Sequence, residues 1–179
     1  PDADSDAAHA LELERVRFFL YLSPSAQDVR SGALAPANDE EALDLARFCV
    51  ALGYDERAAA ILAEQLDAQV DFAPAHPLED LRLLASAAAL RASRLAEEES
   101  RLGLRSRALT WLTASVTALE GTRAKLPATP DAIERSARAH LRHPDLALVR
   151  EGHLLAALPE EERAAWSSLW RRFEALLSR

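Results

Sequence analysis

The C-terminal segment, from Asp145 to Arg179, constrains the fold of this chain more than any other part. After Leu158-Pro159, large apolar residues recur at steps of three and four, which is the spacing of one helix face. These residues are Trp166, Leu169, Trp170, Phe173, Leu176 and Leu177. Because burial of one large apolar side chain is worth about 1.5–3 kcal/mol, this stripe predicts a terminal helix whose apolar face is covered.

The terminal stripe can be covered in two ways. It can pack on the preceding helices of the same chain and cap them, or it can pair with a second copy of the chain. Capping is the favoured interpretation, because the preceding helices supply the apolar face that the stripe needs.

Composition favours helices throughout the chain. Hydrophobic residues make up 49% and charged residues 28%, there are only five glycines, and alanine is very frequent. Alanine loses no side-chain entropy in a helix, whereas the β-branched residues typical of strands are sparse here. No run alternates between apolar and polar residues, so the sequence predicts an all-α fold.

Start and stop signals divide the chain into helices. Asn38 followed by Glu41 is a capping-box pattern, and Gly53 is suited to the left-handed position after a helix. Thr129-Pro130 is a cap and first-turn pair, and Pro144 ends the helix that it begins. The predicted helices cover residues 6–22, 39–52, 55–69, 78–99, 104–126 and 129–142, with loops over 23–38 and 70–77 and the terminal segment after 144.

The helix pair from Asn38 to Asp71 follows the pattern of a tetratricopeptide repeat (TPR). Small and medium apolar residues lie where two helices must approach closely, at Ala42, Leu45, Ala46, Cys49, Ala58, Leu62 and Leu66. A small residue such as Ala46 lets the facing helix come near, while leucines fill the remaining space. The match needs one extra residue at Arg57, and the proline that usually follows the second helix arrives late, as Pro74. The second pair, residues 78–126, is longer and less regular.

From Glu40 onward the chain resembles the TPR-containing C-terminal region of large bacterial multidomain proteins, many of which carry a eukaryotic-like serine/threonine kinase domain. The segments that carry the resemblance are ALDLARFC, YDERAAAILAEQL, RLLASAAALRA, RSRALTWL and PDLALVREGHLLAALPEEERAAWSSLWRRFEALL. One departure is that related chains often have polar or cysteine positions where this chain has Leu84 and Ala87. No glycine-rich phosphate loop, HRD-type loop or DFG is present, so any kinase domain would lie outside this sequence.

The resemblance implies one all-α domain of stacked helical hairpins. Residues 1–38 form an N-terminal helix and loop, 39–126 two TPR-like pairs, and 127–179 the C-terminal helices and cap. Whether residues 1–38 belong to a preceding repeat or only cover the first hairpin stays open. A groove lined by the first helix of each pair would bind a protein or peptide partner. The candidate contacts are Asp44, Arg47, Arg82 and Arg91.

Four other features have structural explanations that we favour over chemistry. His140, His143 and His153 lack a carboxylate or cysteine partner at metal-ligand spacing, and Cys49 lies in an apolar helical run that disfavours a nucleophile. Trp111 is expected to fill the core. Glutamates at 160–162 and arginines at 171, 172 and 179 complement the dipole of the last helix and need no ligand.

Charge excludes some partners. The net charge of −8 disfavours nucleic acid, whose phosphates require a basic surface. The arginines between 91 and 107 could form a basic patch for an acidic partner, but the run Glu97–Glu99 lies among them. The four-residue spacing of Arg94 with Glu98 and of Glu97 with Arg101 favours a self-paired, solvated face. No apolar run approaches the roughly 20 residues that span a bilayer, and no signal peptide is recognisable. We therefore expect no membrane association and a cytoplasmic location.

Three functions remain open at this point: a helical-repeat interaction module, a structural or oligomerisation domain without a groove, and an enzyme. The enzyme, if there is one, would be metal-dependent. The first is favoured, with no catalytic residues, no cofactor and no metal, and with a monomer favoured over a homo-oligomer. The chain begins at Pro1 and has no methionine, which favours a processed product or an excised domain.

Overall fold

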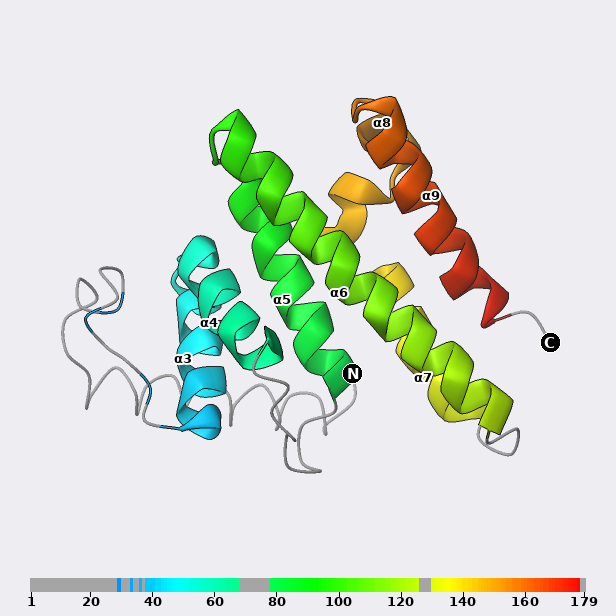
Figure 1. Ribbon diagram of the computed structural model, residues 1–179, viewed down its shortest axis with the longest axis horizontal. Coiled ribbons are helices and arrows are strands. Elements are labelled where there is room, and N and C mark those ends of the chain that lie inside the picture. Colours follow the sequence, from blue (N-terminus) through cyan, green and yellow to red (C-terminus); the bar gives the residue numbers. More distant parts are fainter. Residues whose placement is uncertain are drawn as a thin grey trace, which may run out of the picture.

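The structure is a computed structural model that describes Val29, Ala33, Pro36 and residues 38–67, 78–125 and 130–177. In these ranges every regular element is helical, which confirms the all-α prediction (Figure 1). The predicted helix over 6–22, most of the loop over 23–38, the loop over 70–77 and the Thr129 cap lie outside the described residues.

The first described hairpin consists of α3 (Asp39–Ala51) and α4 (Asp55–Asp67). Asn38 caps α3 as predicted, because its side chain accepts a hydrogen bond of 2.9 Å from the amide of Glu41. Gly53 has a φ of +75°. The amides of Gly53 and Tyr54 donate to the carbonyls of Val50 and Cys49, which is the Schellman pattern that ends a helix at glycine.

The second hairpin consists of α5 (Leu78–Ser93) and α6 (Glu98–Lys125). The predicted boundaries, 99 for the end of one helix and 104 for the start of the next, are wrong. The amides of Arg94 and Leu95 bond to the carbonyls three residues earlier, and the hydroxyl of Ser93 donates to the carbonyl of Leu90. These bonds tighten the last turn of α5 and end it there. A side-chain bond of 2.9 Å from Arg101 to the carbonyl of Ala96 then secures the turn before α6.

The earlier turn also corrects the predicted charge pairing. Arg94 lies beyond the end of α5 and Glu97 before the start of α6, so neither shares a continuous helix with its expected partner. Arg91 and Arg105 form ion pairs instead with residues from other elements. These two arginines are therefore paired between elements rather than along one helix.

The C-terminal part comprises α7 (Pro130–Arg142), the 3₁₀ helix η1 (Pro144–Val149), α8 (Gly152–Leu155) and α9 (Glu160–Ala175). Pro144 follows α7 as predicted, and the ring of His143 accepts a bond of 3.3 Å from the amide of Asp145 at the start of η1. Proline cannot continue a helix because it lacks the amide proton.

Each described helix from α3 to α6 packs on the next one along the chain, and η1 packs on α5. Figure 1 shows the two hairpins side by side, with α9 on the other side of the long α6 and α7 behind the lower part of α6. Residues 85–90 of α5 are all buried, which fits a helix packed by α4, α6 and η1. One continuous apolar core thus joins the hairpins to the C-terminal helices.

No helix within the described ranges combines the length and apolar character needed to cross a membrane.

Candidate functional site

The candidate groove residues lie on α3 and α5, the first helices of the two hairpins. Asp44 and Arg47 are one turn apart on α3, both are partly exposed, and they form an ion pair at 3.6 Å. Arg82 lies on the second turn of α5 and is half-buried. Arg91 lies in the last turn of α5, more than two turns away from Arg82. The structure therefore pairs two of the four residues and separates the other two along one helix.

Arg91 connects three elements. Its Nε donates to Oδ1 of Asp55 at the start of α4 at 2.8 Å, and its Nη1 donates to Oδ2 of Asp145 in η1. The side chain is only 22% exposed, so water screens these contacts weakly. The remaining guanidinium nitrogen, Nη2, is buried and has no hydrogen-bond partner among the described residues. Sequence reasoning missed both partners, because they are separated from Arg91 by 36 and 54 residues.

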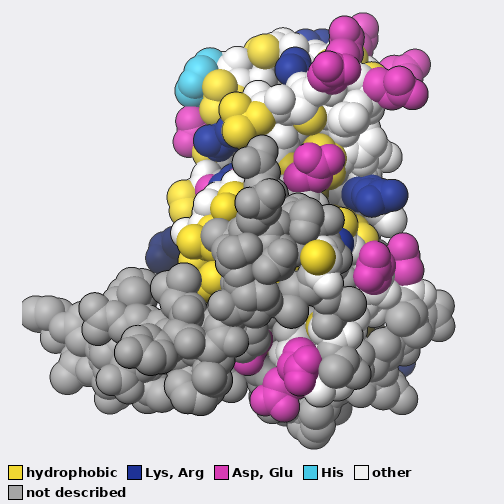
Figure 2. Space-filling view, turned by 90° about the vertical axis from the view of Figure 1, so that its left-hand side faces the viewer, with side chains coloured by type: hydrophobic (Ala, Val, Ile, Leu, Met, Phe, Trp, Pro, Cys, Tyr) yellow, Lys and Arg dark blue, Asp and Glu magenta, His cyan; other side chains and the backbone are white. Residues whose placement is uncertain are grey.

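Among the described residues, the two most exposed large hydrophobic side chains lie in the α5–α6 turn and near the start of α6. Leu95 is 94% exposed and Leu102 is 46% exposed. Glu97, Glu98 and Glu99 lie between them and are also exposed. Figure 2 shows acidic side chains gathered at the upper end of the molecule, where Figure 1 places this turn and the start of α9. Single exposed leucines are common on soluble proteins and do not define a site.

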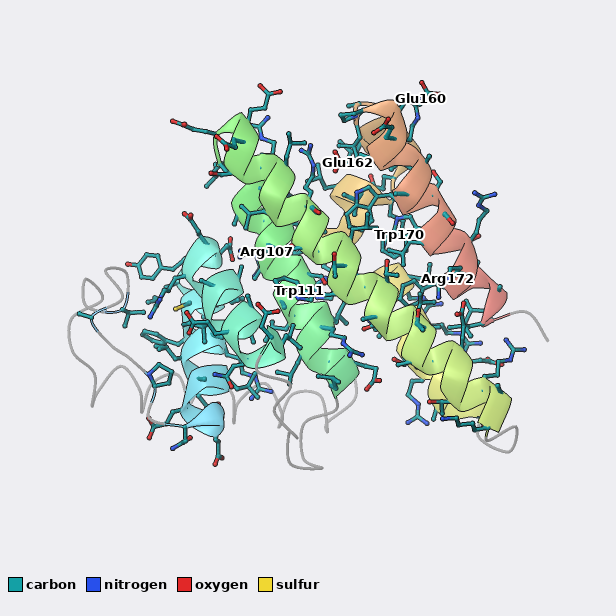
Figure 3. All side chains as sticks on the ribbon, viewed as in Figure 1. Arg107, Trp111, Glu160, Glu162, Trp170 and Arg172 are labelled. Atoms are coloured by element: carbon teal, nitrogen blue, oxygen red, sulfur yellow. The ribbon has the colours of Figure 1, made fainter. Side chains whose placement is uncertain are left out.

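A second ion-paired network joins α9 to α6. Arg105 forms a two-pronged pair with Glu162, at 2.6 and 2.9 Å, and both side chains are largely buried. Arg172 forms a second two-pronged pair with Glu120, at 3.0 and 2.7 Å, and also donates to Thr117. The hydrogen bonding of Arg172 to Glu120 lowers the pKa of the Glu120 carboxyl. Figure 3 shows Glu162 and Arg172 on α9 beside α6.

These pairs extend the interpretation of the charges on α9. Glu160–Glu162 do lie in the first turn and Arg172 in the last, where they complement the helix dipole. Glu162 and Arg172 also hold α9 against α6, which the sequence pattern did not reveal. Arg179 lies outside the described residues.

The terminal stripe is buried within the single chain. Trp166 and Phe173 are fully buried, Leu169, Trp170 and Leu176 nearly so, and Leu177 is half-buried. The indole of Trp170 donates to the carbonyl of Val149 in η1 at 2.6 Å, so α9 is fixed to η1 as well as to α6 and α7. The prediction of a covered stripe is confirmed.

The histidines lie in different surroundings. His140, on α7, is 1% exposed and stacks on Phe173, with ring centroids 4.8 Å apart. His143 is half-buried beside Asp145, and His153 is exposed on α8. Burial lowers the pKa of His140 and of His143. Across the described ranges, no three His, Cys, Asp or Glu side chains are grouped so that they could hold a metal ion.

Cys49 and Trp111 are core residues, as predicted. Cys49 is fully buried, and burial raises the pKa of its thiol to about 11, with Arg57 opposing part of that effect. A thiol with so high a pKa is a poor nucleophile at neutral pH. Trp111 is 8% exposed and belongs to the same apolar core as Leu112 and Val116.

Comparisons with protein-family models, with curated protein sequences and with solved structures find no match to this chain.

Proposed function

We propose that this chain is a non-catalytic, TPR-like helical module that binds a protein or peptide partner. The observation that supports the proposal best is the packing order, in which α3, α4, α5 and α6 each pack on the next helix along the chain. Stacked helical hairpins form extended binding surfaces, and in this proposal α3 and α5, the first helices of the two hairpins, form that surface. The resemblance of the C-terminal segment adds a setting, a cytoplasmic signalling protein with a serine/threonine kinase domain elsewhere in the polypeptide.

The binding residues in this proposal are those with side chains available on α3 and α5. Arg47 is 38% exposed and its pair with Asp44, at 3.6 Å, is a weak surface contact that a ligand carboxylate can replace. Arg82 is half-buried and supplies a second cation. Arg91 contributes indirectly, because it holds the start of α4 and η1 against α5.

A selection from a random peptide library displayed on phage tests this function. We expect enriched peptides with a shared acidic or amphipathic motif and saturable one-to-one binding by calorimetry. Arg82→Glu and Arg47→Glu should each weaken binding at least about tenfold, which corresponds to about 1.4 kcal/mol. Glu64→Arg is the matched control, because Glu64 is exposed on α4, the second helix of its hairpin. Failure to enrich any peptide, or equal loss in the control, would contradict the proposal.

One observation favours a second candidate, a structural domain without a groove. Asp44 and Arg47 pair with each other and Arg91 pairs with two carboxylates, so much of the candidate surface satisfies its own charges. Under this alternative no peptide is enriched, and sedimentation would show concentration-dependent association. Under the favoured function the module sediments as a monomer at all concentrations.

A further inference from the structure

His140 is a buried titratable side chain that neither function explains. It lies near the end of α7, where α7 packs against α9, and its ring is stacked on Phe173 with an interplanar angle of 21°. Phe173 belongs to the terminal stripe and is fully buried. His140 is therefore part of the contact that covers the apolar face of α9.

The hydrogen bonds of His140 define one protonation state. Nδ1 lies 2.9 Å from the carbonyl oxygen of Ser136, an acceptor, so Nδ1 must carry the proton. Nε2 is buried, and it has no hydrogen-bond partner among the described residues. The neutral ring with its proton on Nδ1 satisfies this environment. Protonation would add a donor and a positive charge at Nε2, where the described residues offer no acceptor.

The charged groups around the ring oppose one another. Glu79 and Asp80, from the first turn of α5, favour the protonated ring, whereas His143, from beyond the end of α7, disfavours it. From α9 the ring meets the Phe173 side chain. Burial outweighs the hydrogen bond to the Ser136 carbonyl and the two carboxylates, all of which favour the protonated ring, so the pKa of His140 is lowered from the ordinary histidine value.

From this geometry we infer that His140 is a pH-sensitive contact, whose protonation releases α9 from α7 and uncovers the terminal stripe. The sign follows from linkage. Below the ordinary histidine pKa, near 6.5, the opened state binds a proton that the closed state does not, so the closed state loses stability as the pH falls. Above that pH the contact is fully formed. The release exposes Trp166 and Trp170, both of which are buried when α9 is in place.

Hydrogen exchange of backbone amides, corrected for the intrinsic pH dependence of exchange, measures this release directly. Between pH 7.5 and 5.5 we expect the opening of α9 to increase, by up to about tenfold per pH unit below pH 6.5. Amides of α3 and α4, which form the first described hairpin, serve as the internal reference, and their exchange should change little. The range stops at pH 5.5 because carboxylates titrate below it.

Substitutions at the histidines complete the test. His140→Phe keeps an aromatic ring against Phe173 without a titrating group, and its α9 exchange should not depend on pH in this range. His140→Gln is a smaller second variant in case the first packs poorly. His153→Gln is the matched control, because His153 is exposed on α8, and it should retain the wild-type dependence. The inference is overturned if wild-type α9 opens no more at pH 5.5 than at 7.5, or if both His140 variants keep the dependence.

Nuclear magnetic resonance of the ring nitrogens gives an independent readout. We expect the Nδ1-protonated tautomer for His140 and a titration midpoint below the ordinary histidine value near 6.5. An Nε2-protonated ring, or a midpoint at or above about 6.5, would also overturn the inference.

Discussion

Replacement of Trp166 by alanine tests whether the terminal helix is an integral part of the core. Trp166 is fully buried and its ring stacks on that of Trp170, with centroids 6.1 Å apart and an interplanar angle of 17°. Truncation of a fully buried aromatic side chain to alanine costs about 3–5 kcal/mol, from lost transfer free energy and from the cavity left behind. The stacked pair accounts for about 0.5–1.5 kcal/mol of this.

The polar side of Trp166 adds little to that sum. Its indole donates to Glu162 at 3.3 Å, which is a long bond, and Glu162 keeps its two-pronged pair with Arg105 when the indole is gone. No buried carboxylate is therefore left unpaired by the substitution. We expect the Trp166→Ala variant to lose about 3–5 kcal/mol of unfolding free energy, and its Tm to fall by roughly 6–20 °C for a chain of this size.

Urea denaturation followed by circular dichroism is the suitable assay, because removal of a tryptophan alters the fluorescence signal itself. Ser168→Ala is the matched control, because Ser168 is exposed on the same helix. This control should stay within about 0.5 kcal/mol of the wild-type protein. A loss below about 1 kcal/mol for Trp166→Ala, with an unchanged denaturant slope, would refute the packing described for α9.

Three further predictions concern other contacts. Arg105→Met or Glu162→Gln alone should lower the free energy of unfolding by about 3–5 kcal/mol, because each leaves a largely buried charge unpaired. The double variant should lose less than the sum of the two single losses, and strict additivity in denaturation experiments would exclude coupling. Gly53→Ala should lower the free energy of unfolding by about 1–2 kcal/mol, because alanine disfavours the left-handed backbone at this position. No steric clash adds to this cost, since a Cβ at Gly53 would meet no atom within 4 Å, and Gly53→Asn should cost less. Cys49 should react with thiol reagents at pH 8 at least about 100-fold more slowly than a free thiol, and a similar rate in the native protein would contradict its burial.

The sequence predicted those parts of the fold that have local signals. Asn38 and Gly53 marked the two ends of α3, because a side-chain cap and a left-handed glycine act within a few residues. The three- and four-residue spacing of the terminal stripe likewise predicted which face of α9 is buried. These signals need no knowledge of distant parts of the chain.

The sequence did not predict features that depend on tertiary contacts. Residues 94–97 contain no glycine or proline and favour helix, so the turn between α5 and α6 has no strong local signal. The pairs of Arg91 and Arg105 join residues at least 36 positions apart. The stack of His140 on Phe173 also joins two helices, which the histidine spacing alone could not indicate.

The central claim is that α3 and α5 present a partner-binding surface. Chemical-shift mapping of the isotope-labelled protein, titrated with a peptide from the phage selection, tests it most directly. The account predicts that the largest amide shifts at saturation lie on α3 and α5, around Arg47 and Arg82, with small shifts on α7 and α9. Shifts concentrated on α6 to α9, or absent at saturating peptide, would contradict it.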